Sequence, residues 1–185
     1  YSDVQADPPE AVVLSAAAFA RDQQIDGVIG LGGGSSMDVA KLIAVLASGR
    51  EDIAQLLESI YGIDLVLCDR LPLIQVPTTA GTGSEVTPIS IVTTGATQKT
   101  GIVSKRLLPD FAILDAQLTV GLPSHVSAAT GVDAMVHAIE AFTSKVKKNI
   151  YSDMLAKQAL LLLSANIRQV CNDGSDLEAR QGMLL

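Results

Sequence analysis

The chain has 185 residues, of which 48% are hydrophobic and 3% aromatic, and its 20 Asp and Glu exceed its 13 Lys and Arg to give a net charge of −7. This apolar fraction excludes a disordered chain, and the acidic balance without a basic stripe argues against a nucleic-acid-binding surface. Two cysteines without CxxC spacing exclude a disulfide framework and a thiolate metal site. With no apolar run of about 18 residues and no secretory signal pattern, we expect a cytoplasmic globular protein without a membrane span.

Helical and strand-like segments alternate in the first two thirds of the chain. Apolar residues at helical spacing predict helices, and short apolar or β-branched runs that end at Gly or Pro predict strands, the first of them buried. Such alternation is typical of a parallel sheet covered by helices, so we expect an α/β fold here. The predicted helices are residues 10–23, 35–48 and 51–59, and the predicted strands lie at 25–34, 71–77, 87–94, 99–104 and 111–115.

After Asp115 the sequence predicts helices only, over residues 124–144 and 150–170, behind a breaker at residues 121–123. We therefore expect two domains, an α/β domain over residues 1–120 and a helical domain that begins at residue 121 and runs to 185. The last residues, ARQGMLL, stop inside a helical pattern without a cap. This suggests that the chain is a piece of a longer one.

A glycine-rich turn, GVIGLGGGSSMDVAK at residues 27–41, is the first motif that carries chemistry. An apolar strand leads through Gly32, Gly33 and Gly34 into a helix. Glycines permit positive φ and the close approach of a ligand, and the free N–H groups at a helix start suit a pyrophosphate anion. The motif therefore predicts phosphate binding.

A structural interpretation of the same turn remains open. Ser35 stands where GxGxxG would have its third glycine, and Asp52 follows a helix instead of a second strand, so the ribose-binding part of the dinucleotide motif has no support. The alternative is a capping box, with Ser35 as the N-cap and Asp38 at position N3.

A loop rich in hydroxyl groups follows the predicted strand at residues 71–77. In VPTTAGTGSEVT, Thr78, Thr79, Thr82 and Ser84 offer hydroxyls that suit phosphate, ribose or amide groups. Ligands of α/β sheets bind beyond the carboxyl ends of such strands, which favours a binding site over the alternative of a plain surface loop.

The third motif, TGVDAMVHAIEAF at residues 130–142, places Asp133 and His137 four residues apart on one helix face. A carboxylate and an imidazole on one face can bind a divalent metal. The alternative is a surface ion pair, which is the commoner meaning of this spacing.

Taken in order, these motifs resemble the iron-containing (group III) alcohol dehydrogenase family. The resemblance implies a dehydroquinate synthase-like architecture, incomplete at both ends. Its parts would be a parallel-sheet dinucleotide-binding domain at residues 1–120, lacking its first strands, and the start of an all-helical metal-binding domain at residues 121–185. The segments that carry the resemblance are GLGGGSSMDVAK, LPLIQVPTTAGTGSEVT, LPDFAILDAQLT and TGVDAMVHAIEAFTS.

The resemblance implies an oxidoreductase that transfers a hydride between an alcohol carbinol and NAD or NADP, with Fe²⁺ or Zn²⁺ polarising the substrate oxygen. It also implies a small alcohol, aldehyde or ketone as substrate and a homo-oligomer at full length. The residues of this span offer no obvious side-chain general base. Asp133 and His137 match two metal ligands. The cofactor-contacting positions would be Gly33, Gly34, Ser35, Asp38, Thr78, Thr79, Thr82, Lys99 and Leu118.

The chain departs from the family in its metal ligands. The family uses one Asp and three His, whereas this chain has two histidines in all, so we expect weak metal binding and no activity from the 185 residues alone. The alternatives are therefore an inactive piece of such an enzyme, or a related NAD- and metal-dependent lyase of the dehydroquinate synthase type. The lyase would need basic residues for its substrate phosphate, and residues 130–142 contain none. The Asp133–His137 pair argues against the metal-free maleylacetate reductases.

Overall fold

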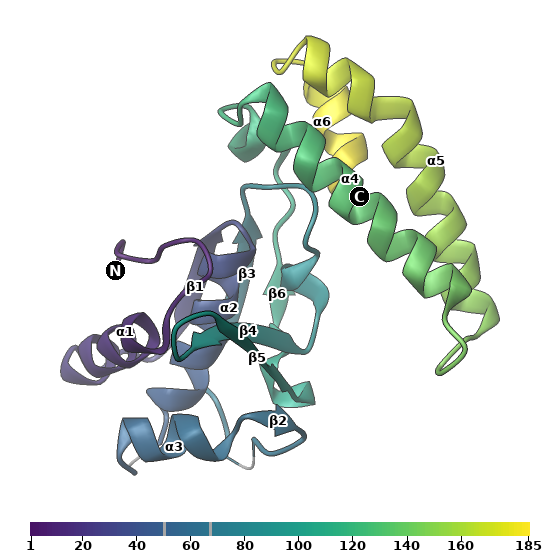
Figure 1. Cartoon of the computed structure of the whole chain (residues 1–185). Helices are drawn as coiled ribbons and strands as arrows, with labels where there is room; N and C mark the ends of the chain where they lie inside the picture. The colour runs from purple at the N-terminus through teal and green to yellow at the C-terminus, as the bar shows by residue number, and fades with distance from the viewer. Residues whose placement is uncertain (50, 67) are drawn as a thin grey trace. The chain divides into compact units, whose positions relative to one another are not determined.

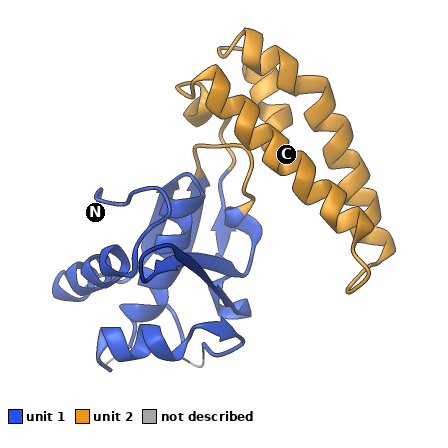
Figure 2. Cartoon of the chain, in the orientation of Figure 1, with its two compact units in different colours: residues 1–76, 84–113 blue, residues 77–83, 114–185 orange. Residues whose placement is uncertain are grey.

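The computed structural model describes residues 1–49, 51–66 and 68–185 (Figure 1). Contacts within the chain divide it into two compact units, which Figure 2 colours separately. The α/β unit consists of Tyr1–Val76 and Ser84–Ile113, and the helical unit consists of Pro77–Gly83 and Leu114–Leu185. In the described part of the chain, no helix is long and apolar enough to cross a membrane.

A three-stranded sheet in the order β1-β3-β6 forms the first part of the α/β unit. Strands β3 and β6 run parallel, which confirms the predicted parallel sheet at this pair. Helix α2 lies so close to β1 that a Cβ at Gly30 would be 2.8 Å from the Cβ of Ala40. Buried Gln75 on β3 donates from Nε2 to Met37 O at 3.0 Å and ties the helix to the sheet. These elements are β1 (Val28–Gly32), α2 (Gly34–Leu46), β3 (Leu73–Pro77) and β6 (Phe111–Ala112).

The second sheet of the α/β unit has the order β2-β5-β4 and combines a parallel and an antiparallel pair. Strand β2 runs parallel to β5, but β4 and β5 are antiparallel. Only three residues connect β4 to β5, which is too short for a parallel crossover, and Gly95 at φ 61° makes the tight turn. The bounds are β2 (Gly62–Ile63), β4 (Ile89–Thr94) and β5 (Gln98–Val103).

Helices α1 (Glu10–Asp22) and α3 (Ile53–Ser59) pack with α2 around the main apolar core. Asp52 is the N-cap of α3 and accepts a hydrogen bond from the Gln55 N–H at 3.0 Å. The carboxylate thus has a structural role, in agreement with its poor fit to a ribose-binding acid. The buried core residues are Val13, Ala16, Ala17, Val39, Leu42, Val45, Leu46, Leu57, Ile60, Val66, Val92, Ile102 and Leu107.

The prediction that the first strand is buried is wrong for most of β1. Gly30 is buried, but Ile29 and Leu31 are 68% and 59% exposed. Successive residues of a strand point to opposite faces, and α2 packs on the face of Gly30. The apolar run therefore predicts the strand correctly but does not predict how much of the strand is buried.

The helical unit is built from a two-helix hairpin and a shorter third helix. Helix α5 packs along α4, and α6 packs against α5 (Figure 1). Both predicted helices are present, and a capping box between Asn149 and Ser152 begins α5. The domain boundary predicted at residue 120 stays a prediction. The bounds are η3 (Ala116–Thr119), α4 (Ser124–Thr143), α5 (Ile150–Asn172) and α6 (Leu177–Leu184).

An ion pair fastens the two segments that lead into β3 and β6. The Asp110 carboxylate accepts hydrogen bonds from Arg70 Nη1 at 2.8 Å, Arg70 Nη2 at 2.9 Å and the Leu73 N–H at 2.8 Å. These bonds, led by those from Arg70, lower the pKa of Asp110 to about 2. The paired carboxylate therefore stabilises the folded chain at any pH above its unfolded pKa of about 4.

Replacing Asp110 by Asn is expected to lower the free energy of unfolding at pH 7, by no more than about 1 kcal/mol because the pair is partly exposed. The difference from the unmodified chain should shrink as the pH falls from about 4 through 2, where the native carboxylate also becomes protonated. Urea unfolding at several pH values measures this. Asp69→Asn is the matched control, since Asp69 is 88% exposed and pairs with Arg106. Equal stability of Asp110→Asn and the unmodified chain at pH 7 would contradict a stabilising role for the Arg70–Asp110 ion pair.

Candidate cofactor and metal sites

The turn between β1 and α2 contains three glycines, and the backbone conformation requires glycine at one of them. Gly32 has φ 147°, and a Cβ there would lie 2.6 Å from Ser36 Oγ. Gly33 is the N-cap at φ −80° and ψ −175°, and Gly34 is already helical. The expectation of positive φ therefore holds at Gly32 alone.

Three backbone N–H groups at the start of α2 precede its first helical hydrogen bond. The Met37 N–H donates to Gly33 O at 3.1 Å, so the N–H groups of residues 34–36 have no acceptor within the helix. The N-cap glycine has no side chain to accept from them. Free donors at the positive end of a helix dipole form an arrangement that suits a pyrophosphate.

The capping-box alternative is wrong. Because Gly33 is the N-cap, position N3 falls to Ser36, and Asp38 lies two residues farther into the helix. Asp38 instead accepts a hydrogen bond from Ser84 Oγ on Oδ1 at 2.6 Å and from the Ile91 N–H on Oδ2 at 2.9 Å. Burial raises the pKa of Asp38, against the lowering effect of Ser84 and of nearby charge. The carboxylate therefore links α2 to the chain around β4.

Sequence reasoning missed Lys41, which lies on α2 three residues after Asp38. Its side chain is fully buried and its ammonium group contacts Asp38 and Ser84. The pattern held one indication of this burial, because Lys41 follows Met37 by one helical turn and Met37 lies at an apolar, core-facing position.

The hydroxyl-rich loop belongs to the helical unit, where it packs on α4. A Cβ at Gly81 would lie 2.6 Å from Thr130 O, so only glycine allows this approach. Thr79 Oγ1 is buried and has no hydrogen-bond partner among the described residues. Since an unsatisfied buried hydroxyl costs about 1–3 kcal/mol, this atom is suited to accept a partner from a ligand. Thr78 and Thr82 lie in the same loop and are partly buried.

Two further cofactor candidates lie in more open surroundings. Lys99 on β5 is 57% exposed and pairs with Asp7 at 2.6 Å. Leu118 on η3 is 42% exposed. The structure thus groups Gly33, Gly34, Ser35 and Asp38 at the start of α2 and adds Lys99 elsewhere in the α/β unit. The candidates of the helical unit are Thr78, Thr79, Thr82, Leu118, Asp133 and His137.

The metal candidates Asp133 and His137 lie side by side on α4. Asp133 Oδ1 and His137 Nε2 are 3.7 Å apart, close to the roughly 3.4 Å between two donors that bind one tetrahedral ion. Their side chains are 47% and 49% exposed. Among the described residues, no group of three or more His, Cys, Asp or Glu is placed to hold a metal. The pair fits two ligands of a site that needs further donors.

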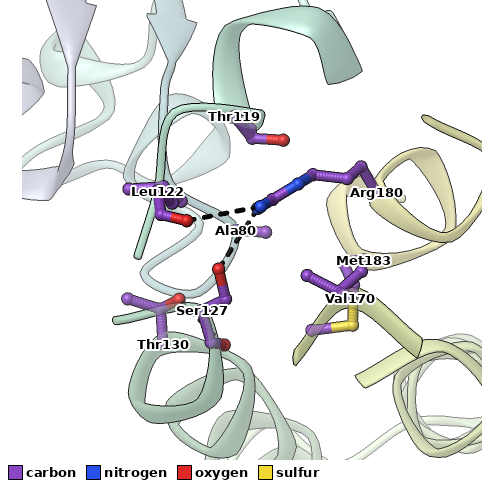
Figure 3. Close-up of a pocket in the computed structure, with 8 residues that line it drawn as sticks. All are labelled: Ala80, Thr119, Leu122, Ser127, Thr130, Val170, Arg180 and Met183. Atoms are coloured by element: carbon purple, nitrogen blue, oxygen red, sulfur yellow. Dashed lines mark hydrogen bonds between the residues drawn. The ribbon is translucent and has the colours of Figure 1, made fainter. Parts of the chain in front are cut away.

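A buried arginine holds the start of α4 (Figure 3). Arg180 on α6 is 3% exposed and points into a pocket that Thr119 and Met183 help to line. It donates hydrogen bonds to Ser127 Oγ at 3.2 Å and to Leu122 O at 3.4 Å. The guanidinium therefore fastens the first turn of α4, and the connection before it, to α6. This fixes the base of the helix that carries the metal candidates.

Comparisons with known proteins cover nearly the whole chain. Residues 1–116 match the family "Iron-containing alcohol dehydrogenase", and residues 127–185 match "Fe-containing alcohol dehydrogenase family, C-terminal". Long-chain-alcohol dehydrogenase 1 of Geobacillus thermodenitrificans is 46% identical over 183 residues, which are 99% of this chain and 46% of that protein. The chain spans about half the length of the curated relatives it matches.

Solved structures agree with these matches. A 1,3-propanediol oxidoreductase superposes with a TM-score of 0.92 at 38% identity, covering 100% of this chain and 47% of that one. The sulfoacetaldehyde reductase of Bifidobacterium kashiwanohense in complex with NAD⁺ gives 0.88 at 34% identity, covering 100% and 48%. They confirm an α/β part with a parallel sheet followed by a helical segment. By sequence and fold, the chain belongs to the iron-containing alcohol dehydrogenase family.

Proposed function

We propose that this chain supplies dinucleotide-binding residues and two metal ligands of an NAD(P)-dependent alcohol dehydrogenase. The observation that carries the proposal is the set of N–H groups at the start of α2 that have no acceptor within the helix, next to the turn at Gly32. A solved relative in complex with NAD⁺ supports the choice of a dinucleotide as the anion. These backbone donors bind the pyrophosphate without needing a charged side chain.

The remaining residues of the proposed cofactor site contribute hydroxyl groups, charged groups and an apolar contact. The orphan hydroxyl of Thr79 gains a hydrogen-bond partner when the cofactor binds. Asp38 lies toward the nicotinamide half, and Leu118 packs against the cofactor. Lys99 contacts it after exchanging its exposed partner Asp7. The proposed cofactor-binding set is Gly33, Gly34, Ser35, Asp38, Thr78, Thr79, Thr82, Lys99 and Leu118.

Asp133 and His137 bind a divalent metal, Fe²⁺ or Zn²⁺, together with donors from elsewhere in the complete protein. The adjacent positions of the pair on α4 support this role. When bound, the metal supplies a Lewis acid that polarises the substrate oxygen, and NAD(P) carries the hydride. The side chains of this span hold and orient these groups, and none of them is assigned as a general base.

The substrate class follows from the relatives. Their names specify a long-chain alcohol, 1,3-propanediol and sulfoacetaldehyde. We therefore expect an alcohol and its aldehyde or ketone as the substrate pair.

The test uses the complete polypeptide that contains these 185 residues. NADH and NADPH are titrated into it and followed by nucleotide fluorescence, and alcohols and diols are then assayed with NAD⁺ or NADP⁺, with and without Fe²⁺ or Zn²⁺. We expect one nucleotide to bind with a dissociation constant between about 1 μM and 1 mM, and turnover that requires the metal. A protein that binds neither nucleotide would contradict the proposal.

A further inference from the structure

Lys41 lies in the interior of the α/β unit with its ammonium group fully enclosed. Its side chain is 0% exposed. Nζ donates hydrogen bonds to Ser84 Oγ at 2.8 Å, to Thr87 Oγ1 at 3.2 Å and to Ile89 O at 2.6 Å. These three acceptors use all three ammonium protons. Lys41 thus ties the middle of α2 to the segment from η1 (Ser84–Val86) to β4.

The same segment holds the Asp38 carboxylate. Ser84 Oγ accepts from Lys41 and donates to Asp38 Oδ1 at 2.6 Å, while Asp38 Oδ1 lies 3.6 Å from Lys41 Nζ. The Ile91 N–H donates to the other carboxylate oxygen at 2.9 Å. Lysine, hydroxyl and carboxylate therefore form one connected network, in which Ser84 is the shared member.

Two carboxylates face the buried Lys41 ammonium group. Besides Asp38, Glu85 on η1 is 8% exposed and interacts electrostatically with Lys41. Burial raises the pKa of both carboxyl groups. It also lowers the pKa of Lys41 to about 8, against the attraction of Asp38 and Glu85. A buried ion pair is in general no more stabilising than apolar side chains of similar volume, so stability alone does not explain a lysine here.

The network lies one helical turn from the proposed pyrophosphate-binding start of α2, and this position indicates its function. Gly34 and Asp38 are four residues apart on α2, so they lie on the same helix face, one turn from each other. An unpaired carboxylate at Asp38 would oppose an anion at the free N–H groups of residues 34–36. Lys41 supplies the nearby positive charge, and together with Ser84 it holds the carboxylate toward β4.

We propose that Lys41 is a positioning residue of the dinucleotide site, which neutralises and orients the Asp38 carboxylate so that the start of α2 accepts a pyrophosphate. This inference rests on the proposed function, because it presumes a dinucleotide at that helix start. Lys41 itself does not touch the cofactor. Its effect reaches the cofactor through Asp38 and the η1 turn.

The test compares Lys41→Met with the double variant Lys41→Met/Asp38→Asn in the complete polypeptide. Lys41→Met leaves the Asp38 charge unopposed and is expected to weaken NADH binding about tenfold at pH 7. The double variant removes that charge as well and should bind NADH about threefold more tightly than Lys41→Met, but more weakly than the unmodified protein, because Asp38 itself belongs to the proposed cofactor-binding set. A purely structural role for Lys41 predicts no such recovery. Lys105→Met is the matched control, because Lys105 is an exposed lysine of the same unit.

A pH series gives a second, independent readout. In the unmodified protein, deprotonation of Lys41 above its pKa of about 8 leaves Asp38 and Glu85 without their counter-charge. Affinity for NADH should therefore fall as the pH rises through about 8. The Lys41→Met variant should lack this fall between pH 7 and 9, and Lys105→Met should retain it.

The outcomes separate this inference from the function on which it rests. Binding of neither nucleotide by the unmodified protein would overturn both. A folded Lys41→Met variant with unchanged affinity and pH profile, or a double variant that stays as weak as Lys41→Met, would overturn the positioning role alone. If Lys41→Met does not fold, the Ser84→Ala variant tests the inference instead. It removes the shared hydroxyl at small volume cost and should weaken NADH binding about threefold, whereas unchanged affinity would overturn the inference.

Discussion

Replacing His137 by alanine is expected to remove nearly all alcohol-dependent turnover and most of the bound metal from the complete polypeptide. Loss of one ligand lowers metal affinity, and without the metal the substrate oxygen is no longer polarised. The melting temperature of the metal-loaded protein should fall as well, because a ligand that binds only the folded state stabilises it by mass action.

If Asp133 and His137 form only a surface ion pair, His137→Ala should change stability and activity very little. Asp133 and His137 are about half exposed, and an exposed helical ion pair contributes about 0.3–0.5 kcal/mol. Elemental analysis and activity after addition of Fe²⁺ or Zn²⁺ distinguish the two interpretations. His125→Ala is the control, since His125 is an exposed histidine near the start of the same helix. Full metal occupancy with near-normal activity in His137→Ala would overturn the ligand assignment.

Replacing Gly34 by valine is expected to weaken NADH binding by at least about 100-fold while the protein stays folded. Gly34 is the first residue of α2, where a branched side chain would lie beside the free N–H groups and obstruct the phosphates. Its backbone is helical, so valine adds no left-handed strain, and the helix propensity of valine is no lower than that of the glycine it replaces.

Fluorescence titration with NADH measures the effect, and circular dichroism checks the fold. Gly121→Val is the matched control, because nothing lies within 4 Å of a Cβ built at Gly121. Unchanged affinity in Gly34→Val would remove the phosphate site from the start of α2.

Local patterns predict the fold well where local geometry decides it. Helical spacing of apolar residues identifies α1, α2, α4 and α5, whose buried faces repeat every turn. Strand direction is different, because alternation of strands and helices predicts a parallel sheet but does not give the direction of each strand. The three-residue turn at Gly95 makes β4 and β5 antiparallel. Burial of β1 also fails, since a strand does not show from its own sequence which face is covered.

In the candidate site, too, local features can be predicted from the sequence and long-range contacts cannot. The glycine turn is visible in sequence because φ 147° at Gly32 admits little else. The capping box fails because the helix begins earlier than a Ser35 cap requires, with a glycine as N-cap. The partners of Asp38 and Lys41, such as Ser84, lie more than 40 residues away along the chain, so no local pattern reveals them.

Hydride transfer from an alcohol to the nicotinamide is the central claim, and isotope labelling tests it directly. The complete polypeptide is incubated with Fe²⁺ or Zn²⁺, NAD⁺ or NADP⁺, and a primary alcohol that carries deuterium on its carbinol carbon. We predict that the reduced nicotinamide carries that deuterium, as mass spectrometry would show. Absence of nicotinamide reduction across a panel of labelled alcohols and diols, or reduced nicotinamide without deuterium, would contradict the account.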